Sequence, residues 1–320
     1  MKAVQASAFG DSSVLSLVEL PSSEPGPGEI RVRVHAAGVN PVEVYIRNGG
    51  YAAYEPGMPY VPGFDAAGVV DAVGAGVDCA VGDRVFVASR DTGTYAELVV
   101  ADASSVWPLP AGVSFAQGAS LGIPGLAAHR ALFERGGLKA GEQVLVHGAS
   151  GAVGYLAVQL ARAAGASVIG TAGSDEGLAA VRDLGVPVVD HRAPDQYDQI
   201  KALTGGHGVD LIVEMLANEN LVDDFTCLAT FGRIVVVGNR GALEFNPRLV
   251  MGKDADIRGV ANWNASPAAR ATALGDLAAK LADGSLVPRV GREFPLAEAA
   301  AAQDYVMTSK ALGKVVLTID

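Results

Sequence analysis

A glycine-rich turn that follows a short apolar run is the part of the chain best suited to chemistry. The sequence VLVHGASGAVG holds three glycines and a serine after the run, at Gly148, Ser150, Gly151 and Gly154, and a helix-like stretch follows. Free N–H groups and the positive dipole end at a helix start bind phosphate, and glycine allows a close backbone approach to a pyrophosphate. The turn therefore predicts a dinucleotide site. The spacing differs from G-x-G-x-x-G, and a turn without a ligand is the alternative interpretation.

The end of the next apolar run indicates which dinucleotide fits. An NAD site usually carries an acid about 20 residues beyond the first glycines, where it accepts from the ribose hydroxyls. Here the run SVIGT ends at Thr171 without an acid at its tip, which permits the 2′-phosphate of NADPH. His191 and Arg192, after a third run, could supply positive charge, whereas Asp175 and Glu176 would oppose it. The alternative for the DHR segment is a solvated loop.

The alternation of strand-like and helix-like segments in the middle of the chain predicts the fold that would position this turn. From about residue 124 to 262, strand-like runs alternate with helix-like stretches such as AVGYLAVQLARAA and DEGLAAVRDLG. We expect strands at 143–148, 167–171, 187–191, 210–215, 233–238 and 256–260. Such alternation is typical of a parallel, doubly wound sheet, and six strands suit a Rossmann-type dinucleotide-binding domain.

The two flanking regions have a different texture. Residues 1–123 contain short β-like runs separated by Gly and Pro turns, among them KAVQASAF, IRVRVHAAGVN and DRVFVAS. Short strands punctuated in this way predict a small, barrel-like β domain. Residues 263–320 read as a helix followed by a final strand in GKVVLTI, and we expect them to return to the first domain.

Composition and charge exclude several classes of protein. Half of the 320 residues are hydrophobic and 18% are charged, which supplies ample material for folded cores. The formal net charge of −11 disfavours a nucleic-acid partner, and we expect none. The sequence shows no membrane span or signal peptide. Its two cysteines, Cys79 and Cys227, form no C-x-x-C pair, which favours a cytoplasmic location.

Several motifs resemble those of the medium-chain dehydrogenase/reductase superfamily. Those motifs are FDAAGVVDAVGAGV, GDRVF, GTYAELVV, VLVHGASGAVG and GKVVL. The stretches HAAGVNPVEVYIRNG, GTAGSDEG, VEMLANENL and VVVGNRG are similar to zinc-free quinone oxidoreductases of the zeta-crystallin type. The resemblance extends from residue 35 to 316. It implies a GroES-like β-barrel catalytic domain beside the Rossmann domain, an active site in the cleft between them, and a homodimer or homotetramer.

One departure from the superfamily's zinc enzymes bears on the chemistry. Those enzymes hold zinc with an early Cys, a His-Glu pair and a mid-chain Cys, and the metal acts as a Lewis acid. Here the first segment has Asn40 and no Cys, the second reads Gly63-Phe64-Asp65, and GIPGLAA has no Cys. We therefore expect no metal, and an acceptor that takes hydride without one: a quinone or an α,β-unsaturated carbonyl.

The resemblance also implies the roles of individual residues. Asn40 and Tyr45 would lie beside the nicotinamide ribose and the substrate carbonyl, and Tyr51 would line the acceptor pocket; a packed wall residue is the alternative for Tyr45, and a surface residue for Tyr51. Tyr45 would also contact NADPH. The remaining implied cofactor-binding residues are Ser150, Gly151, Ala152, Val153, Gly173, His191, Asn220, Val237, Gly238, Asn239, Arg240, Val260, Ala261 and Asn262.

Three functions follow from this resemblance. The first is NADPH-dependent reduction of quinones. The second is NADPH-dependent reduction of the C=C bond of α,β-unsaturated carbonyls. The third is a low-turnover NADPH-binding protein of the crystallin or RNA-binding type, although the acidic composition disfavours RNA. The segment GVANWNAS departs from the family's more apolar stretch, which indicates a different acceptor pocket.

Overall fold

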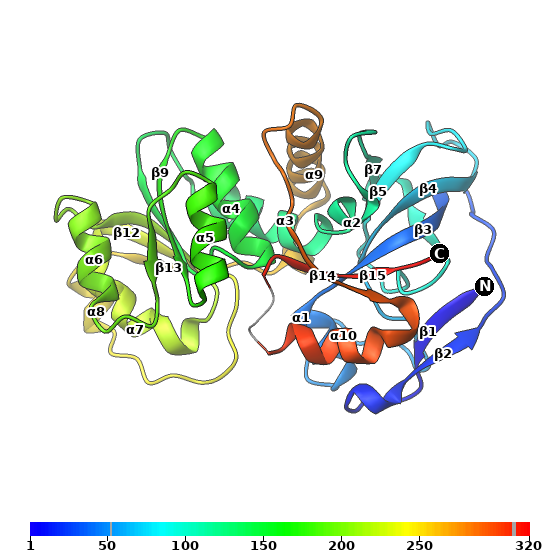
Figure 1. The fold of residues 1–320 in the computed structure, drawn as a ribbon, viewed down its shortest axis with the longest axis horizontal. Helices are drawn as coiled ribbons and strands as arrows, with labels where there is room; N and C mark the ends of the chain where they lie inside the picture. The colour runs from blue at the N-terminus through cyan, green and yellow to red at the C-terminus, as the bar shows by residue number, and fades with distance from the viewer. Residues whose placement is uncertain (52, 309–311) are drawn as a thin grey trace. The chain divides into compact units, whose positions relative to one another are not determined.

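The structure, a computed structural model, describes residues 1–51, 53–308 and 312–320. The chain forms two compact units (Figure 1): unit 1 comprises Met1–Pro124 and Leu274–Asp320, and unit 2 comprises Gly125–Ala273. The sequence places the domain boundaries after residues 123 and 262. The structure divides after Pro124 and Ala273, because helices α3 (Gly122–His129) and α9 (Pro267–Ala282) run through the two boundaries.

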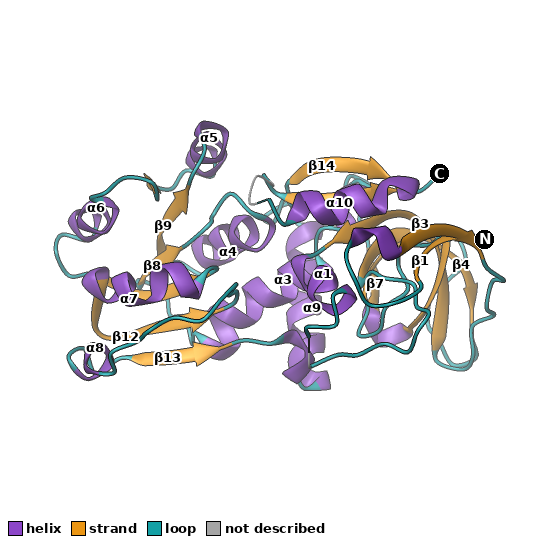
Figure 2. Ribbon diagram, turned by 90° about the horizontal axis from the view of Figure 1, so that it is seen from below, coloured by secondary structure: helices purple, strands orange, loops and turns teal. Residues whose placement is uncertain are grey.

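Unit 2 is built on a parallel sheet of six strands, and helices lie beside it (Figure 2). Its strands are β8 (Gln143–Val146), β9 (Ser167–Ala172), β10 (Val188–Asp190), β11 (Val209–Glu214), β12 (Leu228–Val236) and β13 (Asp256–Gly259). The strand order is β10-β9-β8-β11-β12-β13, and all neighbours are parallel. From β8 the chain adds β9 and β10 on one side and then crosses to add β11, β12 and β13 on the other side. This order is that of a Rossmann fold, in which ligands bind at the carboxyl ends of the strands near this crossing point. All six predicted strands are present, and the predicted α/β fold class is confirmed.

The helices of unit 2 connect these strands or follow them. They are α4 (Ala152–Ala163), α5 (Asp175–Asp183), α6 (Gln196–Leu203), α7 (Ala217–Cys227) and α8 (Arg248–Met251), together with a π-helical segment at Arg130–Arg135 and a 3-10 turn at Asn262–Asn264. Between sheet and helices lies an apolar core that includes Leu145, Ile169, Ile212 and Ile234. Strands covered on both faces read as continuous apolar runs, which explains why these strands were visible in the sequence.

Unit 1 holds a larger, mostly antiparallel sheet and a separate two-stranded one. The larger sheet contains β3 (Glu29–Val39), β4 (Asp65–Val73), β5 (Arg84–Ala88), β6 (Leu98–Asp102), β7 (Val106–Pro108), β14 (Val290–Pro295) and β15 (Lys314–Thr318). Its path runs β14-β15-β3-β4-β5-β7, with β6 paired to β3. This sheet agrees with the barrel-like β domain predicted from the sequence, although its path does not close into a ring among the described residues. The smaller sheet pairs β1 (Lys2–Ala6) with β2 (Leu15–Glu19).

Short helices complete unit 1. They are α1 (Pro41–Arg47), α2 (Phe115–Gly118), α10 (Ala299–Val306) and 3-10 turns at Ser12–Val14, Ala103–Ser105 and Leu296–Glu298. The final strand β15 pairs with both β3 and β14, so the C-terminal residues do return to the N-terminal sheet. No helix among the described residues combines the length and apolar character that a membrane crossing requires.

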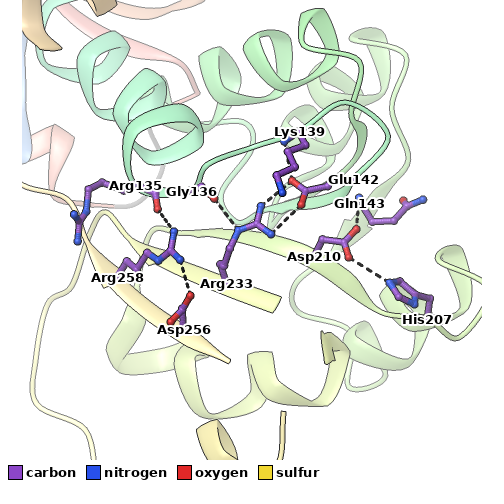
Figure 3. A network of polar contacts seen from close by, with 10 residues as sticks. All are labelled: Arg135, Gly136, Lys139, Glu142, Gln143, His207, Asp210, Arg233, Asp256 and Arg258. Carbon is purple, nitrogen blue, oxygen red and sulfur yellow. Dashed lines mark hydrogen bonds and ion pairs between the residues drawn. The ribbon is translucent and has the colours of Figure 1, made fainter. Parts of the chain in front are cut away.

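A polar network ties the amino ends of the unit 2 strands together (Figure 3). Arg233 on β12 forms two hydrogen bonds with the Glu142 carboxylate, at 2.9 and 2.7 Å, and donates to the Gly136 carbonyl at 2.7 Å. On β11, Asp210 accepts from the Gln143 backbone N–H at 2.8 Å. Side-chain hydrogen bonds therefore link the segments at the amino end of this sheet.

Candidate active site

The glycine turn between β8 and α4 has the geometry of an anion cradle. Gly148 has φ +55°, in the left-handed region that favours glycine. Gly151 is the N-cap of α4 and has no side chain, so no N-cap side chain satisfies the N–H groups of the first turn. A Cβ on Gly154 would lie 2.3 Å from the Gly148 carbonyl oxygen, so only glycine allows the helix to pack this closely. These residues fit the pyrophosphate of a dinucleotide.

The turns that follow β11 and β12 are joined to each other beside the cradle. Val237 N–H donates to the Glu214 carbonyl at 2.8 Å, and Ala217 N–H donates to the Gly238 carbonyl at 3.1 Å. A Cβ on Gly238 would lie 2.3 Å from the Met215 carbonyl oxygen, so the two turns are in close contact there. The structure thus brings the predicted cofactor residues at Val237 and Gly238 to the same edge as Gly151.

Three further predicted residues, Asn220, Asn239 and Arg240, extend this edge. The Asn218 side chain, on α7, accepts from the Arg240 backbone N–H at 2.8 Å. The Asn239 amide donates to the Gly241 carbonyl at 2.6 Å, within its own turn. Asn220 donates to the Glu214 carboxylate at 3.0 Å, and that acid was not predicted. Side-chain hydrogen bonds therefore hold the turns after β11 and β12 in their shapes.

The predicted adenosine end lies where β9 and β10 finish. A Cβ on Gly173 would lie 2.0 Å from His191 Nε2, so the imidazole packs directly against the glycine. Burial lowers the pKa of His191, which favours its neutral form. Arg192 is paired with Asp190 at 2.7 Å and lies 3.8 Å from Asp175. Its charge is therefore already matched within its own loop.

An arginine that was not predicted holds the segment Val260–Asn262 in place. Arg130 Nη1 donates to the Ala261 carbonyl at 2.6 Å, and the Arg130 side chain is only 3% exposed. Its other nitrogens donate to Glu134 at 2.6 and 2.9 Å. Val260 N–H donates to the Val236 carbonyl at 3.0 Å. The one available sequence signal is a lone arginine within the apolar stretch AAHRALF.

Asn40 in unit 1 lies in a buried polar network. Its side-chain nitrogen donates to Glu43 and to Asp65, both at 2.9 Å, and its side-chain oxygen accepts from Lys314 at 2.5 Å. Asp65 also accepts from Lys314 at 2.8 Å, and Tyr95 donates to Glu43 at 2.5 Å. All five side chains are buried. The amide hydrogens of Asn40 are thus directed at carboxylates within unit 1.

This network fixes the start of α1, the helix that carries Tyr45. Asn40 is the N-cap of α1, and Glu43 accepts from the Asn40 backbone N–H at 3.0 Å, so the two residues form a capping box. Burial raises the pKa of Glu43 to about 7, against the opposing effect of the Lys314 charge. The orientation of Tyr45 therefore depends on a desolvated cluster of charges.

The predicted tyrosines and the phenylalanine differ in burial. Tyr45 is partly buried, and within residues 1–51, 53–308 and 312–320 its hydroxyl forms no hydrogen bond. Tyr51 is also partly buried, and burial raises its pKa. Phe64, at the position where zinc enzymes of the superfamily carry histidine, is fully buried and meets the Tyr54 ring edge-on at 5.5 Å. It offers no metal-binding atom.

Comparison with known proteins identifies the family. A family profile described as "Alcohol dehydrogenase GroES-like domain" matches residues 26–111, and one described as "Zinc-binding dehydrogenase" matches residues 152–279. The chain is 44% identical to quinone oxidoreductase of Rattus norvegicus over 100% of this chain and 98% of the relative. The chain belongs to the medium-chain dehydrogenase/reductase superfamily and, within it, to the quinone oxidoreductase family.

Solved structures agree with this assignment. Quinone oxidoreductase of Escherichia coli, complexed with NADPH, is 29% identical and has a TM-score of 0.89, with 100% of each chain covered. A protein described as NAD-dependent alcohol dehydrogenase is 32% identical with a TM-score of 0.90, again with 100% of each chain covered. The predicted family is therefore confirmed, and the neighbours include proteins named for both nicotinamide cofactors.

Proposed function

We propose that the protein is an NADPH-dependent quinone oxidoreductase. The observation that carries the proposal is the glycine cradle at the start of α4, in a chain that is 44% identical over its full length to a quinone oxidoreductase. When bound, the cofactor supplies the hydride, and the protein contributes binding, orientation and electrostatics.

The cofactor would lie along the carboxyl edge of the unit 2 sheet. The turn Ser150–Val153 would hold the pyrophosphate with its N–H groups. Gly173 and His191 would face the adenosine. Because the His191 imidazole packs directly against Gly173, a side chain at position 173 would displace the imidazole. Asn220 and the turns at Val237–Arg240 and Val260–Asn262 would contact the remainder of the cofactor.

In unit 1, we propose that the Tyr45 hydroxyl donates a hydrogen bond to the oxygen of the substrate that is reduced. Tyr51 would line the substrate pocket. Reduction places negative charge on that oxygen, and a hydroxyl positioned in the site would stabilise it. Asn40 is better suited to a positioning role, because its amide hydrogens are directed at Glu43 and Asp65. This assignment replaces the donor role that the resemblance implies for Asn40.

A matched pair of glycine variants tests the cofactor site. A Cβ on Gly151 would lie 3.4 Å from the Gly148 carbonyl oxygen, an ordinary contact, and its φ of −81° suits any residue. Gly151→Val should therefore remain folded by circular dichroism and lose NADPH binding in a fluorescence titration. Gly154→Val should instead destabilise unit 2, because its Cβ would lie 2.3 Å from the Gly148 carbonyl oxygen. A folded Gly151→Val protein with wild-type NADPH affinity would contradict the site.

The substrate class needs a separate assay. NADPH oxidation should be followed with 9,10-phenanthrenequinone and with a simple enone such as cyclohexenone. Turnover of the quinone supports quinone reduction, and faster turnover of the enone would favour the alternative activity on C=C bonds. Binding of NADPH without turnover of either compound would indicate the low-turnover binding protein.

Assembly and location complete the proposal. We propose a homodimer or homotetramer, because β13 is the last strand of its sheet and the nearby Phe231 and Met251 are 70% and 72% exposed. Light scattering coupled to gel filtration measures the mass directly, and a monomer would contradict this. A cytoplasmic location is supported by Cys79 and Cys227, which are both free thiols.

A further inference from the structure

Three titratable side chains form a buried cluster under the glycine turn of unit 2. They are His147 at the end of β8, Glu214 at the end of β11 and Asp224 on α7, and each is no more than 2% exposed. His147 Nε2 lies 2.8 Å from Asp224 Oδ1 and 3.5 Å from Glu214 Oε2. The resemblance to known enzymes assigned no role to any of the three.

The cluster is connected to the cradle through Thr171. His147 Nδ1 lies 3.3 Å from Thr171 Oγ1, and the same oxygen accepts from the Gly148 backbone N–H at 3.1 Å. Thr171 also accepts, through its carbonyl, from the Ala149 N–H at 2.8 Å. The position of His147 is therefore linked to the first residues of the glycine turn.

Glu214 connects the cluster to the other two cofactor turns. Its Oε1 accepts from the Leu216 backbone N–H and, at 3.0 Å, from the Asn220 side chain. Its backbone carbonyl accepts from Val237 N–H at 2.8 Å and from Gly238 N–H at 3.3 Å. One residue thus holds the turn after β11 with its side chain and the turn after β12 with its main chain.

The second carboxylate oxygen of Glu214 is the unusual feature. Glu214 Oε2 and Asp224 Oδ2 are both buried, and neither has a hydrogen-bond partner within residues 1–51, 53–308 and 312–320. Leaving two ionised carboxylates beside one imidazole in an apolar interior is costly, and a proton on Oε2 removes one charge. Because Oε1 accepts the hydrogen bonds from Leu216 and Asn220, Oε2 can be protonated or deprotonated while those hydrogen bonds are kept.

We propose that Glu214 is a proton-linked positioning residue of the cofactor site: its Oε1 holds the turns after β11 and β12, and its Oε2 exchanges a proton beside His147 and Asp224. The inference rests on the proposed function, since it takes the carboxyl edge of unit 2 as the cofactor site.

Ionisation of Glu214 should weaken cofactor binding. Burial raises the pKa of Glu214 to about 7, opposed by the His147 charge and reinforced by Asp224. Above that pH the cluster carries one more negative charge, and a buried charge acts on a nearby pyrophosphate with little screening. Cofactor binding should therefore weaken as the pH rises through neutrality.

Other titratable groups surround the cluster and must be separated from it. They are Tyr197 on α6, Asp223 and Cys227 on α7, His191 after β10 and Lys253 before β13. Burial raises the pKa of Cys227 to about 12 and raises the pKa of Tyr197 further, so both stay neutral near pH 7. Burial lowers the pKa of His191, which moves its titration to the acid side of the range.

The test is the pH dependence of dinucleotide binding, measured by fluorescence titration between pH 6 and 8.5. NADH is the main probe, because the 2′-phosphate of NADPH itself titrates near this range. For the wild-type protein we expect the NADH Kd to rise by up to about tenfold, the effect of a one-unit shift in the Glu214 pKa on binding. A Kd that does not change across this range would overturn the proposal without any variant.

Two substitutions assign the effect. Glu214→Gln keeps an acceptor for Leu216 and Asn220, and its Kd for NADH should rise clearly less with pH than that of the wild type, because only His147 still changes charge in this range. Glu142→Gln makes the same change at the amino end of the same sheet and should keep the wild-type profile. A folded Glu214→Gln protein whose NADH Kd depends on pH as in the wild type would refute the proton linkage. The linkage would also be refuted if a chelator removed a stoichiometric metal ion and abolished the pH dependence of the wild-type Kd.

A third variant covers the case in which Glu214→Gln does not fold. His147→Asn removes a charge that favours ionised Glu214, so the midpoint of the NADH profile should move to higher pH. An unchanged midpoint would also contradict the proposal. The outcomes separate from those of the proposed function: if Gly151→Val still binds NADPH, the cofactor site itself is wrong, whereas loss of binding in Gly151→Val with a wild-type profile in Glu214→Gln rejects only the role of Glu214.

Discussion

Lys314 Nζ lies 2.8 Å from Asp65 Oδ2, and neither side chain is more than 2% exposed. Asp65 begins β4 and Lys314 begins β15, so the ion pair joins the N-terminal part of unit 1 to its C-terminal strand. Asp65 Oδ1 also accepts from the Ile123 N–H at 2.7 Å. Both members of the pair thus make further hydrogen bonds within unit 1, and the loss of either would leave the other charge buried without its counter-ion.

Lys314→Met should destabilise unit 1 severely. Removing one partner of a buried ion pair typically costs about 3–5 kcal/mol, because the remaining charge is left desolvated. Chemical denaturation should show this as a large fall in the unfolding midpoint. The control is Lys280→Met, which breaks the more exposed pair with Asp276 at 3.6 Å and should cost about 1 kcal/mol or less. Equal effects of the two variants would contradict the importance assigned to the buried pair.

The stability of the protein should fall between about pH 5 and pH 7 in part because of Glu43. Burial raises its folded-state pKa to about 7, well above the ordinary value of 4.5. A raised pKa means that the folded state holds the proton more tightly, so this stabilisation is complete in acid and is lost as the pH rises through 7. The full difference is roughly 3 kcal/mol at 1.36 kcal/mol per pH unit.

Glu43→Gln should therefore flatten the dependence of unfolding free energy on pH. The amide retains an acceptor for the Asn40 N–H and cannot ionise. Denaturation midpoints at pH 5, 6, 7 and 8 for the wild type and the variant measure the difference in slope. Parallel curves for the two proteins would show that Glu43 does not titrate in this range.

The sequence predicted the strands of unit 2 well because local composition determines them. Runs of Val, Ile and Leu that end at glycines show where buried parallel strands stop, and the six expected strands are present. In unit 1, β7 and β14 were missed, since one has three residues and the other, VGREFP, carries two charges.

The polar partners of the site were beyond local patterns. Lys314 contacts Asn40 and Asp65 across 274 and 249 positions of sequence, and no periodicity encodes such a contact. The role that the resemblance implies for Asn40 could not take this lysine into account. His147 and Glu214 were visible only as the polar ends of apolar strands, so their clustering became apparent once the sheet order was known.

Arg192 and Asp190 should have opposite effects on the preference for NADPH. Arg192 is exposed and paired with Asp190 at 2.7 Å, so a 2′-phosphate would have to compete with that carboxylate. Arg192→Ala should weaken NADPH binding roughly fivefold in Kd, with little effect on NADH. Asp190→Asn should tighten NADPH binding by freeing the guanidinium. Fluorescence titration with both cofactors tests this, and tighter binding of NADH than NADPH by the wild type would reject the proposed preference.

Zinc should be dispensable for activity. Phe64 is buried at the position where zinc enzymes of the superfamily place a histidine, and Asn40 is engaged with Lys314 and two carboxylates. Elemental analysis of the purified protein should therefore find no stoichiometric zinc. Incubation with a chelator should leave quinone turnover unchanged. One zinc per chain, lost together with activity, would contradict this interpretation.

Tyr45→Phe tests the proposed donor to the acceptor oxygen. The substitution removes only the hydroxyl, which forms no hydrogen bond within the described residues, so the packing of the α1 helix should be preserved. Loss of one donor from a site shielded from water costs about 2.7–4 kcal/mol in the barrier, or roughly 10²–10³ in kcat. We expect a lower kcat with little change in NADPH affinity. The effect should be larger for enones, because quinones accept electrons readily without a hydrogen bond to the oxygen. Steady-state kinetics with both substrates measure this. Tyr54→Phe is the control, since it removes a hydroxyl that accepts from the Thr92 backbone N–H at 3.2 Å and should leave kcat near the wild-type value. If Tyr45→Phe keeps the wild-type kcat for both substrates, Tyr45 is a wall residue and the oxygen is stabilised by backbone groups or water.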